Sequence, residues 1–222
     1  MTLAVANTEK WLWWDWISRN ADTIFAALRE HLLFTVVSVL CGLVLALPLG
    51  VLAARRPRLR TAVLGLTGAV YTIPSLALFA ILVPALGLSR STVIIPLTGY
   101  TLLILVRNIV AGLDSVPADI VESADGMGYT RFARLVRVEL PLALPAVMAG
   151  VRIATVTTIG LCTIAAIAGL GGLGQLIVTG LNRPMRTAVT VGAVLSVALA
   201  VLADLGLGLV QRKLSPWAAE AR

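Results

Sequence analysis

The sequence predicts an all-α integral membrane protein with about five transmembrane helices. Hydrophobic residues make up 59% of the 222 residues and charged residues only 13%, and the mean hydropathy is +0.95. Such a composition is typical of a chain buried in lipid. The apolar runs are long enough to cross a hydrocarbon core about 30 Å thick, and they lack the two-residue alternation of a barrel strand.

Five apolar runs define the expected spans and the expected domains. The spans are about 32–54, 61–86, 92–112, 141–168 and 186–210. They divide the chain into an extracytoplasmic or interfacial N-terminal segment (1–31), a membrane domain (32–210) with a cytoplasmic loop at 114–140, and a cytoplasmic C-terminal tail (211–222). Cys41 and Cys162 fall inside spans, where we expect small apolar packing residues rather than a disulfide.

The distribution of Lys and Arg predicts the orientation in the membrane. With the N-terminus outside, ten of the 18 basic residues lie on the cytoplasmic side, six lie outside and two lie within spans. The run "RRPRLR" at 55–60 is the sharpest cytoplasmic marker, and Arg222 also falls on that side. We therefore expect an outside N-terminus and a cytoplasmic C-terminus. No basic patch is interleaved with aromatic residues, so nucleic acid is not expected as a partner.

The N-terminal segment contains the tryptophan-rich stretch "WLWWDW" at 11–16. Tryptophan faces attract cations, so one interpretation is an aromatic cage for a quaternary ammonium group. The other is an interfacial anchor with the indoles at the level of the lipid headgroups. Consecutive helical residues point in different directions, and this favours the anchor.

The sequence contains no convincing catalytic or metal-binding constellation. "GLGGLG" satisfies G-x-G-x-x-G through Gly169, Gly171 and Gly174, but a membrane helix precedes it instead of a strand. We expect a flexible outer turn where helices approach closely. His31 is the single histidine, and no phosphate-binding loop is present. We therefore expect no enzyme activity, no metal and no cofactor bound by this chain.

Charged residues inside the spans need a partner or a water-filled cavity, because a central Arg costs about 2.5–3.5 kcal/mol on insertion scales. Arg107 is near the inner end of the third span, and Arg152 is about 16 Å deeper than Pro141. We expect Asp204 to pair with Arg152 or with Arg107, in a structural role or in a transport pathway. The polar, proline-broken patch Tyr71, Thr72, Pro74 and Ser75 is a candidate for the pathway itself.

The cytoplasmic loop has the features of two short helices. Pro117 suits the first turn of one, Asp119 and Glu122 complement its positive end, and Gly126 suits its stop. Thr130 is placed to cap a second helix, with basic residues three apart at Arg131, Arg134 and Arg137. The alternative is a solvated linker with its basic residues at the lipid headgroups, and composition alone leaves both open.

A motif in this loop resembles a known family. Glu122-Ser123-Ala124, three residues, Gly128, nine residues and Val138-Glu139-Leu140-Pro141 resemble the E-A-A-x3-G-x9-I-x-L-P loop of inner-membrane permeases of binding-protein-dependent ABC importers. Ser123 and Val138 depart mildly from it. The stretches "EHLLFTVVSV", "YTIPSLALFAILVPALGL" and "VELPLALPAVMAGVRIATV" are similar to the permeases for glycine betaine, carnitine and choline.

The resemblance implies a type I (MetI-like) importer permease of the bacterial plasma membrane that takes up quaternary-amine osmoprotectants by alternating access. It implies three kinds of partner: two cytoplasmic ATP-binding subunits, which carry ATP and Mg; a second permease, identical or homologous; and an extracytoplasmic substrate-binding protein. The loop would dock on the ATP-binding subunit through Glu122, Ser123, Ala124, Asp125, Gly126, Gly128, Leu140 and Pro141, where small residues permit close contact.

Alternatives remain open at this level. One is a permease of the same class for an amino acid, a bile acid or a thiol-betaine. Another is a stand-alone secondary transporter, although five spans without an inverted repeat offer little for ion coupling.

Overall fold

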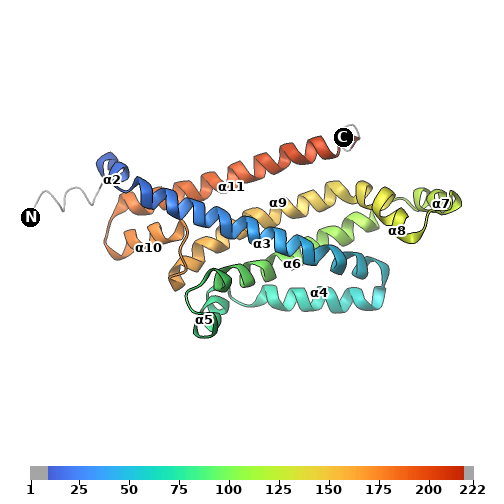
Figure 1. Ribbon diagram of the computed structural model, residues 1–222, viewed down its shortest axis with the longest axis horizontal. Helices are drawn as coiled ribbons and strands as arrows, with labels where there is room; N and C mark the ends of the chain where they lie inside the picture. Colours follow the sequence, from blue (N-terminus) through green and yellow to red (C-terminus); the bar gives the residue numbers. More distant parts are fainter. Residues whose placement is uncertain (1–9, 218–222) are drawn as a thin grey trace, which may run out of the picture. The chain divides into compact units, whose positions relative to one another are not determined.

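The structure is a computed structural model, and it describes residues 10–217. Every regular element in this part of the chain is helical. In order, these are α2 (Trp14–Arg19), α3 (Ala21–Arg55), α4 (Pro57–Thr72), α5 (Ser75–Leu86), α6 (Arg90–Asp114), α7 (Ala118–Gly126), α8 (Arg131–Arg134), the π-helical turn η1 (Leu135–Glu139), α9 (Leu140–Ala165), the 3-10 turn η2 (Ala166–Ala168), α10 (Gly174–Asn182) and α11 (Arg186–Leu214) (Figure 1).

The predicted all-α membrane fold is confirmed. Four continuous helical stretches are long and apolar enough to cross a membrane, namely Ala21–Arg55, Arg90–Asp114, Arg131–Ala168 and Arg186–Leu214. Residues 1–9 of the predicted N-terminal segment and 218–222 of the predicted tail, including Arg222, lie outside the described residues. The division into N-terminal segment, membrane domain and tail stays a prediction.

The predicted second span, 61–86, differs from the structure. Its residues form two helices, α4 and α5, which meet the length and hydropathy requirements of a span only as a bent pair. The break falls at Ile73 and Pro74, where Pro74 is the extended residue that precedes α5. Proline has no N–H for a helical hydrogen bond and pushes the residue before it out of the helical region, which explains the interruption.

The chain forms two compact units that are interleaved along the sequence. The first contains Met1–Val39, Ile73–Thr98 and Thr155–Leu202, and the second contains Leu40–Thr72, Gly99–Ala154 and Ala203–Arg222. Long helices such as α3 and α9 therefore contribute residues to both. A buried apolar cluster holds the first unit together, with members Phe34, Phe79, Val93, Leu97, Cys162, Ala165 and Leu170.

Close helix packing holds the second unit together. An added Cβ at Gly50 of α3 would lie 2.6 Å from a side-chain atom of Ile109 of α6. A Cβ at Gly112 of α6 would lie 2.9 Å from the carbonyl oxygen of Ala143 of α9. Small residues thus let three helix backbones approach each other, as is typical of bundles in lipid (Figure 1).

Candidate functional site

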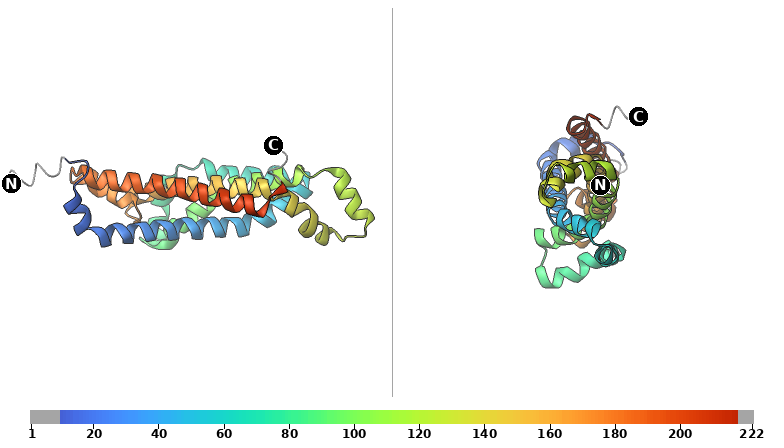
Figure 2. Two further views of the ribbon diagram at one scale, coloured as in Figure 1. Left: turned by 90° about the horizontal axis from the view of Figure 1, so that it is seen from above. Right: turned by 90° about the vertical axis from the view of Figure 1, so that its right-hand side faces the viewer.

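The loop between α6 and α9 is a folded helical hairpin and not a solvated linker. It consists of α7, a short connection and α8, which leads through η1 into α9. Figures 1 and 2 show α7 and α8 extending past the ends of α6 and α9, the helices that they connect. The loop therefore presents ordered helical surface outside the bundle of its own unit.

The helix α7 ends at Gly126, as predicted, and Gly128 completes the cap that follows this end. Gly128 has a φ of 81°, a left-handed conformation that suits glycine. Its N–H donates to Asp125 O at 3.0 Å, and Tyr129 N donates to Ala124 O at 3.2 Å. These two bonds form a Schellman motif, which satisfies carbonyl groups left over at the helix end. Gly126 is the last residue of α7, two positions before Gly128.

The start of α8 agrees with the prediction. Thr130 is extended, and its Oγ1 accepts a hydrogen bond from Ala133 N at 3.2 Å. The helix then runs without a break from Arg131 to Ala168, so the second loop helix and the predicted fourth span (141–168) form one continuous helix. Leu140 and Pro141 lie in the first turn of α9 and do not begin a separate helix. The π-helical turn before them accommodates the proline, since such local adjustments satisfy the backbone groups that it frees.

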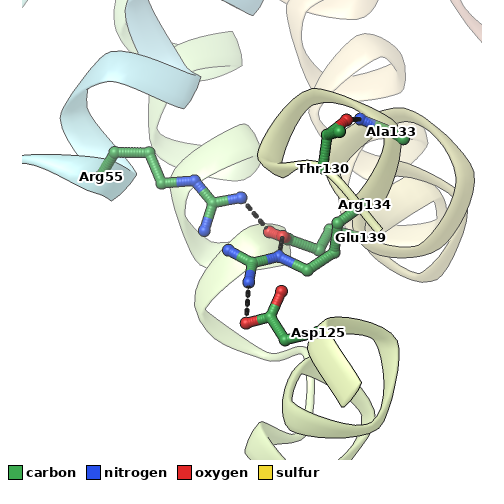
Figure 3. A network of polar contacts seen from close by, with 6 residues as sticks. All are labelled: Arg55, Asp125, Thr130, Ala133, Arg134 and Glu139. Atoms are coloured by element: carbon green, nitrogen blue, oxygen red, sulfur yellow. Dashed lines mark hydrogen bonds and ion pairs between the residues drawn. The ribbon is translucent and has the colours of Figure 1, made fainter. Parts of the chain in front are cut away.

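Four charged residues form a network at the base of the hairpin (Figure 3). Glu139 is 2% exposed, and its Oε1 accepts from Arg134 Nε at 2.8 Å. Its other oxygen accepts from Arg55 of α3, and Arg134 also donates to Asp125 of α7. The alternative with all basic residues of the loop at the lipid headgroups does not hold for Arg134, because its side chain is only 13% exposed and is held by two carboxylates.

The arginine run at 55–60 lies beside this loop, which sequence reasoning missed. Arg55 pairs with Glu139, and Arg60 pairs with Asp114 at 2.7 Å. These acids stand close to the two ends of the predicted loop. The sequence signal for such a pairing was Glu139, an acidic residue at the start of an apolar span, because a buried carboxylate needs a partner.

The other predicted loop residues divide by exposure. Glu122 and Ser123 are exposed, and Ser123 Oγ donates to Asp119 O at 2.7 Å. Ala124 is only 1% exposed, so packing within this chain explains its small size, and it is not free to meet a partner. The described surface of α7 thus presents Glu122, Ser123 and Asp125, while Ala124 faces inward.

The predicted intramembrane ion pair forms between Arg152 and Asp204. Arg152 donates from Nε to Asp204 Oδ1 at 2.9 Å and from a terminal nitrogen to Oδ2 at 2.8 Å. A third nitrogen contacts Gln211 Oε1 at 3.3 Å. The planar guanidinium matches a carboxylate in this two-bond geometry. Arg107, the other predicted partner, is exposed.

The candidate pathway residues lie on both sides of the break between α4 and α5. Tyr71 and Thr72 end α4, Pro74 precedes α5, and Ser75 is the first residue of α5. Tyr71 packs edge-to-face against Tyr100, with ring centroids 5.9 Å apart. Thr72 Oγ1 donates to Ala69 O at 2.8 Å. Their role in a pathway stays a prediction.

In the first unit, the predicted glycine turn is held by two residues of α3 that sequence reasoning missed. Gly169, Gly171 and Gly172 all have positive φ. Glu30 Oε2 accepts from Gly172 N at 2.9 Å, and His31 Nδ1 accepts from Leu173 N at 3.3 Å. The close helix approach expected here is present, and the turn is pinned to α3 by these two bonds.

The tryptophan segment does not form a box. Trp11 lies under the guanidinium of Arg186, 5.3 Å from the ring centroid. Trp13 N donates to Thr187 Oγ1 at 3.1 Å, which ties the segment to the start of α11. The guanidinium of Arg186 thus occupies a ring face of Trp11 that an aromatic cage would offer to a cationic ligand.

Long apolar helices joined by a folded, charged hairpin define the class of polytopic membrane proteins. The family model described as "Binding-protein-dependent transport system inner membrane component" matches residues 46–216. The chain belongs to this family, and it is an inner-membrane transport component.

Curated relatives match almost the whole chain. The glycine betaine/carnitine/choline transport system permease protein OpuCD of Bacillus subtilis (strain 168) is 41% identical over 200 residues, which cover 90% of this chain and 87% of the relative. The osmoprotectant import permease protein OsmW of Salmonella typhimurium is 36% identical, covering 89% of this chain and 94% of the relative. These similarities agree with the predicted family.

A solved structure confirms the type I importer fold. An inward-facing conformation of the MetNI methionine ABC transporter superposes with a TM-score of 0.79 at 26% identity. The match covers 86% of this chain and 95% of that chain.

Proposed function

We propose that the chain is the permease subunit of an ATP-driven importer for quaternary-amine osmoprotectants such as glycine betaine, choline and carnitine. The observation that carries this solute class is the 41% identity, over 90% of the chain, to a permease named for these three solutes. A relative named for choline alone is 35% identical over 91% of the chain. The solute crosses by alternating access, in which closure of a partner favours one arrangement of the helices over the other.

The hairpin of α7 and α8 is the proposed contact with the ATP-binding subunit, which binds ATP and Mg and performs the hydrolysis. Support comes from its exposed surface. Met127 is 70% exposed and Phe132 is 76% exposed, and both lie on the hairpin. Exposed apolar side chains on an ordered surface are suited to contact with another protein. The exposed Glu122 would orient this contact.

The proposed complex contains two permeases, identical or homologous, two ATP-binding subunits and an extracytoplasmic substrate-binding protein. In this arrangement the N-terminus lies outside and the C-terminus in the cytoplasm. The ion pairs of Arg55 and Arg60 support this orientation, because they hold the arginine run on the same side as the loop. A basic run of this kind favours the cytoplasmic side.

Uptake into proteoliposomes tests the proposal. The vesicles contain the complete complex, and labelled glycine betaine, choline, carnitine and methionine are compared with and without ATP and the binding protein. We expect ATP-dependent accumulation of at least one quaternary amine and none of methionine. Accumulation of methionine alone would favour an amino-acid permease, the alternative that the likeness to a methionine transporter supports. Uptake that does not depend on ATP would contradict the proposal of an ATP-driven importer and favour a secondary transporter.

A further inference from the structure

The π-helical turn brings Arg134 and Glu139 to the same side of their helix. In an α-helix, side chains five residues apart point about 140° away from each other. Here Leu140 N donates to Leu135 O, a bond that spans five residues. This wider turn realigns side chains at that spacing, and Arg134 Nε reaches Glu139 Oε1 at 2.8 Å. The contact therefore depends on the local departure from α-helical geometry.

Glu139 serves as a buried anchor for two arginines. Its side chain is only 3% exposed, and one oxygen faces Arg134 while the other faces Arg55 at the end of α3. A buried carboxylate is stable only when it is paired and hydrogen-bonded. Both of its oxygens are engaged, so the start of α9 and the end of α3 are joined at this residue.

Arg134 extends this connection to α7. Its Nε holds Glu139, and one of its terminal nitrogens donates to Asp125 in the last turn of α7. The covalent link from α7 to α8 passes through Gly128, which has a left-handed backbone and no side chain to limit its motion. In addition to the two backbone bonds of the Schellman motif, the Asp125–Arg134 pair gives α7 a side-chain brace to α8 (Figure 3).

We propose that Arg134 is a positioning residue that couples α7 to the helices of its unit. Through Asp125 and Glu139, it transmits a displacement of α7 to the start of α9 and the end of α3. This inference rests on the proposed function, in which an ATP-binding subunit moves α7. Without the brace, α7 would move while α9 and α3 stay in place, and ATP would be hydrolysed with less transport.

The test uses Asp125→Asn, which removes one charge from a residue whose side chain is 51% exposed. The matched control is Asp114→Asn, because Asp114 is 41% exposed and pairs with Arg60, which takes no part in the Asp125–Arg134–Glu139 connection. Asp125→Glu keeps the charge and serves as the rescue variant. A half-exposed ion pair changes an equilibrium about two- to fivefold, so we expect Asp125→Asn to lower the solute transported per ATP by this factor.

Two measurements read the result. In proteoliposomes with the complete complex, uptake and hydrolysis are measured together. In nanodiscs with the permease alone, the mobility of a spin label at Met127 is measured after Cys41 and Cys162 are replaced by serine. We expect Asp125→Asn to lower the transport-to-hydrolysis ratio and to increase label mobility. Asp125→Glu should keep the label mobility of the unmodified permease, and Asp114→Asn should change neither quantity.

The outcomes separate this inference from the proposed function. An unchanged ratio in Asp125→Asn, or a parallel fall of uptake and hydrolysis, would overturn the positioning role while ATP-driven uptake by the unmodified complex stands. Unchanged label mobility in Asp125→Asn would overturn it as well. If the unmodified complex shows no ATP-dependent uptake of any solute, the proposed function fails and the inference fails with it.

Discussion

Alanine at Gly126 and at Gly128 is expected to change the stability of α7 in opposite directions, although the two residues are only two positions apart. Gly128 has a φ of 81°, and an added Cβ there would meet no atom within 4 Å. The cost of Gly128→Ala is therefore conformational, about 1–2 kcal/mol for a side chain in the left-handed region. Gly126 is the last helical residue of α7, and its Cβ would also meet no atom within 4 Å. Gly126→Ala should therefore stabilise the helix by up to about 1 kcal/mol.

Hydrogen exchange of α7 amides in nanodiscs measures both changes. Because local opening controls exchange, 1–2 kcal/mol corresponds to roughly five- to thirtyfold faster exchange in Gly128→Ala. Gly126→Ala should exchange up to about fivefold more slowly. Gly128→Asn is the control, since Asn tolerates the left-handed region and should fall between glycine and alanine. A shift of both alanine variants in the same direction, or no change in Gly128→Ala, would refute the reasoning.

Two further predictions concern polar contacts in the two units. Reversal of either charge, Arg152→Asp or Asp204→Arg, should reduce the yield of monodisperse protein in size-exclusion chromatography, and the double reversal should recover much of it; a double variant no better than the singles would contradict the pairing. Glu30→Ala removes the acceptor for Gly172 N. Cys162 packs beside this turn, so in a Cys41→Ser background its thiol should react faster with a maleimide. Glu30→Gln keeps a carbonyl acceptor and should react slowly, and equal rates in the two variants would count against the pinned turn.

The order of the four continuous apolar helices could be predicted because lipid imposes a minimum length on every apolar run. The helix ends could not be predicted in this way, because hydropathy indicates which residues lie in lipid and not where the helical backbone begins or ends. α3 begins at Ala21, eleven residues before the apolar run, because charged residues continue a helix as readily outside lipid as apolar ones do inside. The break at Pro74 was visible in the sequence, but membrane helices often contain proline, and Pro48 lies inside α3.

In the candidate site, contacts between residues close in sequence could be predicted, and contacts between residues far apart in sequence could not. Local rules predicted the cap at Thr130, because capping depends on residues three positions apart. The pairing of Arg55 with Glu139 joins residues 84 positions apart, and periodicity carries no information about such contacts. The π-helical turn that aligns Arg134 with Glu139 has no sequence signature at all. Asp204 could be predicted to have a partner, but the choice of Arg152 over Arg107 required the helix packing.

Gly126 separates what the fold requires from what a partner requires. The backbone of α7 requires Gly128, whereas nothing within the described chain requires glycine at Gly126, because a Cβ there would meet open space. Glycine is also a weaker helix former than alanine, by up to about 1 kcal/mol, so its presence in the last turn of α7 favours a reason outside this chain. Close approach of the ATP-binding subunit supplies one. If so, Gly126→Ala should stabilise α7 in the isolated permease and still weaken copurification of that subunit. Stabilisation with unchanged copurification would place the contact elsewhere on the hairpin.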